Sequence, residues 1–181
     1  MAQIDMLYGD SVRLRAIERT DVPTFTRWFN DPQVRRTLLM TDPISEDEEH
    51  RWFEKQLESP DKIFGIELPT PEGWLLVGNI GLLELNWKDR SAKTGIVIGE
   101  KDQWGKGHGR DAMRTLARYA FEELNLHRIE LEVFDYNERA ARCYETCGFV
   151  REGTRRQAHF ADGAYHDVHM MGILAEERTE G

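Results

Sequence analysis

Apolar residues in the first third of the chain change from the period of a strand to the period of a helix. Over residues 11–17 they occupy every second position, which predicts a half-buried strand. Thr20 is a suitable N-cap for the helical pattern that follows, and Asn30-Asp31-Pro32 is a stop signal. Ser45 and Glu48 have the spacing of a capping box, so a second helix is expected to begin there.

The middle of the chain has the pattern of strands followed by one long helix. Apolar runs at residues 63–68 and 75–85, separated by a short loop, predict a hairpin, and residues 93–98 predict a further strand. From Gly107 to Leu124 the apolar positions form one helical stripe, the clearest helix pattern in the chain.

The last third returns to strands around a short helix. Alternation over residues 129–134 predicts a strand, and Asn137 is a favoured N-cap for a helix that ends at Cys147. Residues 149–174 have the pattern of two strands around an Asp162-Gly163 turn.

Composition then limits the class of protein. The chain has 181 residues, 40% of them apolar, with 24 Lys plus Arg against 33 Asp plus Glu and a formal net charge of −9. A compact fold of this length removes roughly 70% of the unfolded chain's surface from water, so a core can form without disulfides or a structural metal. No apolar run reaches the roughly 20 residues of a membrane span, and the N-terminus lacks the features of a signal peptide. We therefore expect one cytoplasmic domain over residues 1–181, with its core at about 10–175 and an acidic tail from Glu176.

The acidic balance also bears on partners. It argues against a nucleic acid, because neutralising phosphates requires a basic surface, and it is compatible with a cationic acceptor such as an amine. Cys143 and Cys147, four residues apart on the last predicted helix, are expected to be reduced and unreactive.

A glycine-rich segment separates the strand at 93–98 from the long helix. Residues 104–110, WGKGHGR, alternate glycines with basic side chains. Glycines let backbone N–H groups approach a ligand, and the helix N-terminus adds partial positive charge, so the segment is suited to a pyrophosphate. It is neither a P-loop nor a dinucleotide fingerprint, since Arg110 stands where the third glycine of GxGxxG would be. From these residues alone, a tight turn that needs glycine only for backbone freedom is an equal alternative.

A second motif gives this loop a family context. Residues 131–149, LEVFDYNERAARCYETCGF, combine a strand, an Asn cap and a short helix with a Tyr. Together with WGKGHG they resemble the GCN5-related N-acetyltransferase (GNAT) family over residues 10–175, and most closely its ribosomal-protein N-terminal and spermidine acetyltransferase branch. The resemblance implies an α/β (α+β) fold with a mixed, mostly antiparallel central sheet of about 6–7 strands and about four helices. It also implies acetyl-CoA as co-substrate, direct acetyl transfer to an amine, and no metal.

The resemblance also implies a set of cofactor contacts. The backbone near Ile98 and Gly99 should pair with the pantetheine arm, the glycine loop should hold the pyrophosphate, and Asn137 should contact the arm. Trp104 stands where the family usually has Arg or Gln. The implied cofactor-binding residues are Ile98, Gly99, Trp104, Gly105, Lys106, Gly107, His108, Gly109, Arg110, Asn137 and Tyr144.

Acetyl transfer needs an acid and a base. Tyr144 lies two helical turns after Asn137, so both can reach one ligand, and the matching Tyr of the family is the usual general acid. Glu132 matches the position of a base in N-terminal acetyltransferases of the family, and Glu130 shares its strand face. Glu84 and an ordered water are the alternative bases. Glu132 and Glu130 can also simply form the solvated face of a strand, with no catalytic role.

Other candidate chemistry is weaker. His159, His166 and His169 are possible metal ligands, but His166 and His169 are expected on opposite sides of a strand, which disfavours a shared metal ion. Neither cysteine has a nearby His in the sequence that would activate it as a nucleophile. The first two helices carry aromatic and acidic residues that suit a cationic acceptor or simply pack the core. These residues are Trp28, Phe29, Asp31, Glu48, Trp52 and Phe53.

The predicted function is therefore an acetyl-CoA-dependent N-acetyltransferase. A protein N-terminal amine, of the ribosomal-protein type, is the favoured acceptor. A small-molecule amine (a polyamine, amino sugar or antibiotic) is the alternative acceptor. A non-catalytic CoA-binding domain is the alternative from another class, and a homodimer is possible for any of them.

Overall fold

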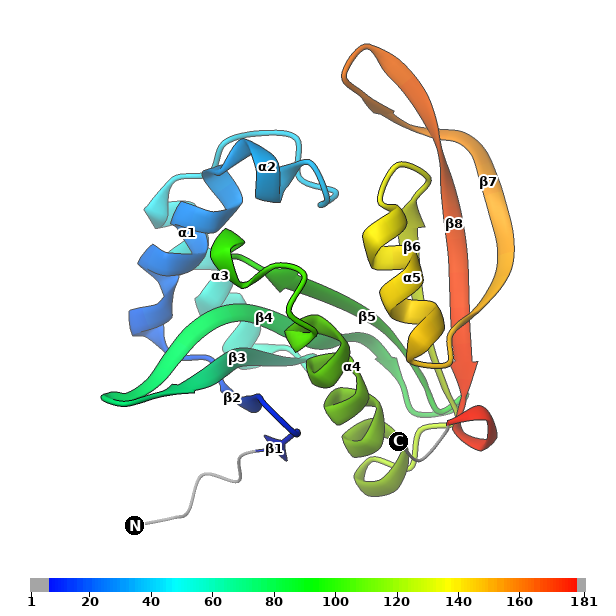
Figure 1. Ribbon diagram of the computed structural model, residues 1–181, viewed down its shortest axis with the longest axis horizontal. Coiled ribbons are helices and arrows are strands. Elements are labelled where there is room, and N and C mark those ends of the chain that lie inside the picture. Colours follow the sequence, from blue (N-terminus) through cyan, green and yellow to red (C-terminus); the bar gives the residue numbers. More distant parts are fainter. Residues whose placement is uncertain (1–6, 179–181) are drawn as a thin grey trace.

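The computed structural model describes residues 7–178. Its strands form one sheet in the order β1-β2-β3-β4-β5-β6-β8-β7 (Figure 1). All neighbouring strands are antiparallel except β5 and β6, which are parallel. The strands are β1 (Leu7–Tyr8), β2 (Arg13–Ala16), β3 (Lys62–Thr70), β4 (Gly73–Asn86), β5 (Ser91–Ile98), β6 (Arg128–Phe134), β7 (Val150–Ala161) and β8 (Ala164–Leu174).

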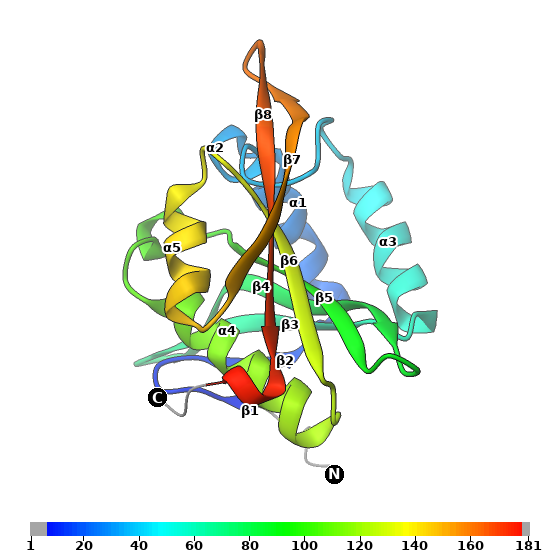
Figure 2. The same ribbon diagram turned by 90° about the vertical axis from the view of Figure 1, so that its right-hand side faces the viewer.

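Helices cover both faces of this sheet (Figures 1 and 2). One face carries the helices α1 to α3, and the other carries α4 and α5. The helices are α1 (Val22–Asn30), α2 (Pro32–Arg35), α3 (Glu46–Glu58), α4 (His108–Arg118) and α5 (Glu138–Thr146). Helix α4 continues as a π-helical turn, Tyr119–Glu123.

Each face has its own apolar core. Leu116 of α4 and Tyr144 of α5 belong to a buried cluster with Ile129 and Leu131 of β6. Phe25, Trp28 and Phe29 of α1 form the second cluster with Val34 of α2, and Trp52 and Val97 pack against it. Because successive side chains of a strand point to opposite faces, these clusters fix which β5 and β6 residues face which helices.

Local sequence signals explain the element boundaries. The Ser45 hydroxyl accepts a hydrogen bond from the Glu48 N–H at 3.2 Å, and the Glu48 carboxylate accepts the Ser45 N–H at 2.7 Å, as the capping box predicted. Asp162 and Gly163 have φ values of 51° and 79°, the left-handed pair that a two-residue hairpin turn requires. The predicted mixed, mostly antiparallel sheet is confirmed.

Four details differ from the expectation. Thr20 does not cap α1: it lies within a 3-10 turn, Arg19–Asp21, and Asp21 is the N-cap. The sheet has eight strands rather than six or seven, because the two-residue strand β1 is too short to show a period. The stop signal at Asn30-Asp31-Pro32 also starts α2, since the Asp31 carboxylate caps it by accepting the Gln33 N–H at 2.9 Å. The predicted tail begins as a bound turn, in which the Glu177 carboxylate accepts the Leu174 N–H at 2.9 Å, and residues 179–181 lie outside the described part.

The parallel pair β5 and β6 separates along its length. The two strands pair only at Ser91, Ala92 and Lys93, opposite Arg128, Ile129 and Glu130. Beyond these pairs, β5 continues beside β4 alone, and the N-terminus of α4 and the helix α5 border the gap. This splay creates the cleft described next. No helix within residues 7–178 is long and apolar enough to cross a membrane.

Candidate active site

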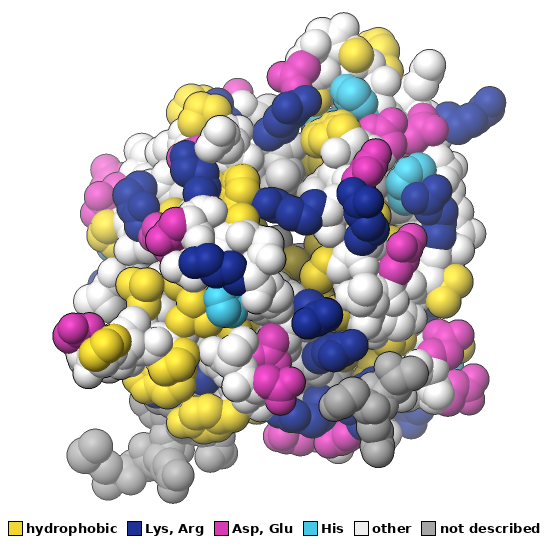
Figure 3. Space-filling view, viewed as in Figure 1, with side chains coloured by type: hydrophobic (Ala, Val, Ile, Leu, Met, Phe, Trp, Pro, Cys, Tyr) yellow, Lys and Arg dark blue, Asp and Glu magenta, His cyan; other side chains and the backbone are white. Residues whose placement is uncertain are grey.

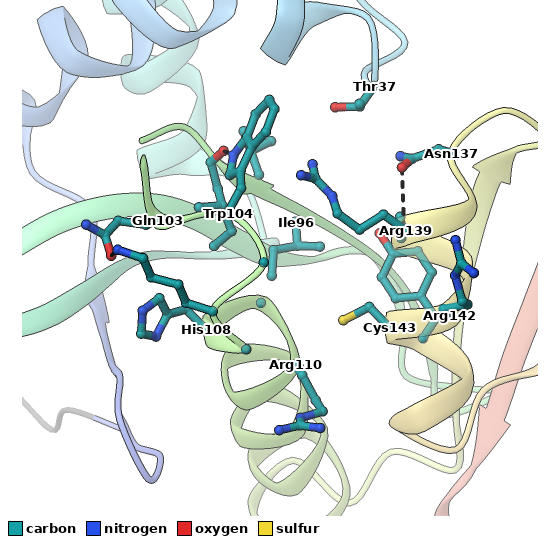
Figure 4. A pocket seen from close by; sticks show the side chains of 18 of the residues that line it. Thr37, Ile96, Gln103, Trp104, His108, Arg110, Asn137, Arg139, Arg142 and Cys143 are labelled. Carbon is teal, nitrogen blue, oxygen red and sulfur yellow. Dashed lines mark hydrogen bonds between the residues drawn. The ribbon is translucent and has the colours of Figure 1, made fainter. Parts of the chain in front are cut away.

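A cavity lies where β5 and β6 diverge. It has a volume of about 520 Å³ and is bordered by the end of β5, the glycine loop and α5 (Figure 4). Lys and Arg side chains gather around the hollow on this side of the molecule (Figure 3). The lining includes ten of the eleven predicted cofactor-binding residues: Ile98, Trp104, Gly105, Lys106, Gly107, His108, Gly109, Arg110, Asn137 and Tyr144.

The glycine loop has the backbone of an anion-binding turn. Gly105 and Gly107 have φ values of 75° and 90°, a region that side chains with a Cβ rarely adopt. Gly107 is the N-cap of the 11-residue helix α4, so the first N–H groups of that helix face the loop without intrahelical acceptors. An anion at this position is stabilised by these donors and by the helix dipole.

A half-buried carboxylate ties residues 10–12 to the start of α4. The Asp111 carboxylate in the first turn of α4 accepts backbone N–H bonds from Asp10, Ser11 and Val12, at 3.0, 2.6 and 3.0 Å. Burial raises the pKa of Asp111, but the hydrogen bonds, first those from Ser11 and Asp10, outweigh it and lower the pKa overall. The N-terminal segment is therefore tied to the start of α4 by an ionised group.

Cations surround the loop. Lys106, Arg110, Arg139 and Arg142 line the cavity, and the Arg139 guanidinium lies 4.3 Å from the ring centroid of Trp104. Among the described residues, only Arg142 of these four pairs with a carboxylate, that of Glu138 at 3.1 Å. The cavity therefore offers uncompensated positive charge, which the acidic average composition does not reveal.

Of the two residues at the end of β5, Ile98 lines the cavity and Gly99 does not. The Ile98 carbonyl accepts the indole N–H of Trp104 at 2.6 Å, which fixes the ring at the entrance of the loop. A Cβ at Gly99 would lie 1.9 Å from the Trp28 ring, and its N–H donates to the Val77 carbonyl at 2.8 Å. Glycine at this position therefore permits close packing of α1 on β5.

Helix α5 presents Asn137 and Tyr144 to the same cavity. The Asn137 side chain caps the helix by accepting the Ala140 N–H at 3.3 Å (Figure 4). Tyr144 is 8% exposed, and its ring packs 6.0 Å from that of Phe149. Burial raises the pKa of the Tyr144 phenol above its ordinary value, so the hydroxyl keeps its proton at neutral pH.

The candidate bases lie on the other face of the sheet. Ile129 and Leu131 of β6 face α4 and α5, so Glu132 faces the side of α1 to α3. Its carboxylate forms an ion pair with Arg155 of β7. Glu84 pairs with Lys93 of β5 at 2.8 Å. Neither carboxylate lines the large cavity, whereas Tyr144 does.

Glu132 and its neighbours enclose a second, smaller cavity. It has a volume of about 130 Å³ and lies on the same face as Glu132. Arg128 bridges two of its carboxylates, those of Glu130 at 3.0 Å and Glu152. The lining residues are Lys93, Arg128, Glu130, Leu131, Glu132, Glu152, Met170 and Met171. The face of the candidate bases is thus an ion-pair network.

Most of the proposed acceptor residues on the first helices serve the fold. Trp28 and Phe53 are buried, at 1% and 5% exposure. Asp31 caps α2 and pairs with Lys101, and Glu48 completes the capping box of α3. Core packing of Trp28 and Phe53 and helix capping by Asp31 and Glu48 therefore account for these four residues without an acceptor.

The histidines of the last hairpin have other contacts. The His159 ring stacks on Phe134 at 4.0 Å, and the His166 ring nitrogen lies 3.1 Å from the Asp135 carboxylate. His169 lies 2.9 Å from the Thr154 hydroxyl. Within the described residues, no group of three or more potential ligand side chains is arranged to hold a metal ion.

The hydrogen-bond donors and cations of the cavity match the chemical groups of acetyl-CoA. The loop N–H groups and the unpaired cations suit its phosphates, and the unpaired edge of β5 suits its amide-containing arm. Nine lining residues were not predicted as cofactor contacts: Thr37, Ile96, Val97, Gln103, Arg139, Ala140, Arg142, Cys143 and Thr146. The two arginines follow Asn137 by two and five residues, so their charge beside the predicted cap was a usable signal, whereas Thr37 reaches the cavity only through tertiary folding.

Comparisons with known proteins agree with this geometry. A family model described as an acetyltransferase (GNAT) domain matches residues 11–150. The spermidine N(1)-acetyltransferase of Vibrio cholerae serotype O1 is 34% identical over 167 residues, which are 92% of this chain and 94% of that protein. A putative ribosomal N-acetyltransferase of Bacillus subtilis is 34% identical over 113 residues, 62% of this chain and 61% of that protein.

A solved structure shares the fold over most of the chain. It is the spermidine N-acetyltransferase from Vibrio cholerae in complex with CoA and spermine. Its TM-score is 0.85 at 32% sequence identity, and the match covers 92% of this chain and 97% of that chain. The expected sheet, helices and nucleotide loop are therefore those of one family. This chain belongs to the GNAT family of acetyl-CoA-dependent N-acetyltransferases.

Proposed function

We propose that this enzyme transfers an acetyl group from acetyl-CoA to a primary amino group of a polyamine such as spermidine. The observation that carries the proposal is the similarity to the Vibrio cholerae spermidine acetyltransferase, which extends over nearly the full length of both chains. The sequence alone favoured a protein N-terminal amine as acceptor, and the comparisons support the small-molecule alternative better.

The reaction requires one bond to form and one to break. The neutral amine attacks the thioester carbonyl and a C–N bond forms. The attacking nitrogen then gives one proton to solvent, and the C–S bond breaks. The CoA thiolate then needs a proton, for which we propose the Tyr144 hydroxyl. Tyr144 lines the cavity, and burial raises the pKa of its phenol, so it enters the reaction protonated. Solvent returns the proton after CoA leaves.

The acceptor must lose a proton before it attacks, because an ammonium has no free electron pair. We propose that the amine approaches from the face of α1 to α3 and that Glu132 receives this proton. Glu132 lies on that face, beside the point where β5 and β6 separate. Its carboxylate forms an ion pair with Arg155 of β7. Glu84, paired with Lys93, and an ordered water are the alternatives.

The cofactor side of the reaction rests on the loop and α5. The N-terminus of α4 and the cations Lys106, Arg110 and Arg139 would hold the phosphates. Asn137 and the edge of β5 would position the pantetheine arm, so that the thioester lies between Tyr144 and the acceptor face. Such positioning converts a bimolecular encounter into an oriented reaction.

One relative favours a second candidate. The matched Bacillus subtilis protein is a putative ribosomal N-acetyltransferase, although the match spans only 61% of its length. A protein N-terminus therefore remains the acceptor to compare against.

Release of free CoA thiol with a panel of acceptors tests the proposal. Spermidine and spermine should give kcat/KM at least about 100-fold above that of peptides with free N-terminal amines, a difference of about 3 kcal/mol in transition-state binding. The reverse order would favour the protein acceptor. CoA binding by calorimetry without turnover of any amine would indicate a non-catalytic CoA-binding domain.

A further inference from the structure

Two thiols meet at the wall of the acetyl-CoA cavity. Cys143 of α5 lines the cavity, and its sulfur points away from α5 into the space toward α4 (Figure 4). Cys147 follows one turn later as the C-cap of α5 and is buried, with its Sγ 3.7 Å from the Arg110 carbonyl. Residues four apart lie above one another on a helix, so the two sulfurs are neighbours.

The surroundings make the two thiols unequal. A hydrogen bond from Cys147 lowers the pKa of Cys143, and although burial raises it, Arg110, Arg114 and Arg139 lower it further, so the net shift is downward. The hydrogen bond to Cys143 and burial raise the pKa of Cys147. Cys143 therefore has the greater thiolate fraction, and it is also the thiol that lines the cavity.

The positive charge around Cys143 favours disulfides that carry phosphate groups. Disulfide exchange needs a thiolate and a disulfide that can reach it. Arg110, Arg139 and Arg142 line the same cavity as Cys143, and the anionic part of acetyl-CoA is proposed to bind there. A disulfide that carries the same phosphorylated nucleotide is drawn to this cavity, whereas a disulfide without phosphates lacks those contacts.

We propose that Cys143 is a covalent modification site that undergoes thiol–disulfide exchange with the disulfide of CoA. The Cys143 thiolate attacks one sulfur of CoA disulfide, a new S–S bond forms, the old S–S bond breaks, and one CoA thiolate leaves. The product is a Cys143–CoA mixed disulfide that occupies the cavity and blocks acetyl-CoA. Two equivalents of a reducing thiol reverse it, releasing CoA and the reagent's own disulfide. The inference needs only CoA binding and does not depend on the identity of the acceptor.

Intact-mass measurement of the reduced protein after incubation with CoA disulfide tests the site. The wild-type protein should gain the mass of one CoA less two hydrogen atoms, and Cys143→Ser should gain nothing. Cys147→Ser is the matched control and should keep the adduct. Peptide mapping of the wild-type adduct gives the site without relying on the fold of either variant. An adduct on Cys147, or one that forms only after denaturation in urea, would overturn the proposal.

The choice of reagent has its own test. Oxidised glutathione at the same concentration should react at least about tenfold more slowly than CoA disulfide, and saturating acetyl-CoA should suppress both reactions. Equal rates would overturn the selection by the arginines. CoA release with any accepted amine should fall in proportion to the adduct and return after dithiothreitol, and an adduct that left turnover intact would contradict the block.

Discussion

The two faces of the sheet present charge in opposite ways. Around the acetyl-CoA cavity, Lys106, Arg110 and Arg139 have no carboxylate partner among the described residues, and a helix N-terminus adds to their charge. On the face of α1 to α3, Glu132 and Glu84 are each paired with a cation. The first arrangement suits an anionic ligand, whereas in the second each carboxylate has a neighbouring cation. The proposed mechanism therefore places cofactor binding and proton removal on opposite faces of the same sheet.

The cofactor side depends first on backbone geometry. Gly107→Val forces a β-branched residue into the left-handed region at the N-cap of α4, a strain of about 1–3 kcal/mol, and fills space that the phosphates approach. We expect at least about a 100-fold loss of CoA affinity by calorimetry. Gly107→Asn is the control, because Asn tolerates this region, and it should retain more affinity. If both variants bound CoA as tightly as the wild type, the backbone conformation at Gly107 would not be needed for CoA binding.

In the proposed mechanism, Tyr144 donates a proton to the CoA thiolate. Tyr144→Phe removes only the hydroxyl, so CoA affinity should stay within about twofold while kcat falls about 100-fold, the lower end of the range for a general acid. Thiol-release kinetics at several pH values measures both effects. An unchanged kcat at every pH would exclude Tyr144 as the proton donor.

The acceptor face makes a smaller, pH-dependent contribution. Glu132→Gln should lower kcat/KM about tenfold at pH 7 and much less above the pKa of the acceptor amine, where the free amine no longer needs a base. Glu84→Gln is the matched control and should follow the wild-type profile. If the control instead shows the loss, Glu84 receives the proton, and if neither variant shows it, an ordered water does.

The smallest expected effect is on the free energy of unfolding, through a buried carboxyl of α3. Glu49 of α3 is 5% exposed, and burial raises its pKa to about 7. Its Oε1 is buried without a hydrogen-bond partner among the described residues. A raised pKa of an acid means that stability is full below the unfolded pKa and is lost as pH rises through about 7. Glu49→Gln should therefore stabilise the fold by about 1 kcal/mol at pH 8, after the cost of its own buried amide.

Urea unfolding of Glu49→Gln and wild type at pH 8 and at pH 5 measures this difference. The advantage of the variant should shrink at pH 5, because the Glu49 carboxyl is then protonated in the fold. Equal differences at both pH values would show that the charge of Glu49 does not matter to stability. Gln56→Glu on the same helix is the control for a change of charge at a site of lower burial.

Local signals account for much of the fold. The capping box at Ser45, the Asn137 cap and the Asp162-Gly163 turn need only neighbouring residues, and all three form as predicted. Strand β1 was missed because two residues carry no period, and α2 because Pro32 signals a helix stop and a helix start alike.

The same distinction explains the site. The sequence by itself determined the glycine loop, Asn137 and Tyr144, because their spacing within short segments places them on one loop and one helix face. Only the tertiary structure decided that Gly99 receives Trp28 and that Cys143 lies among arginines. It also decided that Glu132 pairs with Arg155, 23 residues away, on the face opposite Tyr144. Ion pairs and close packing of this kind join strands and helices that are distant along the chain, so no local pattern of charge or hydrophobicity specifies them.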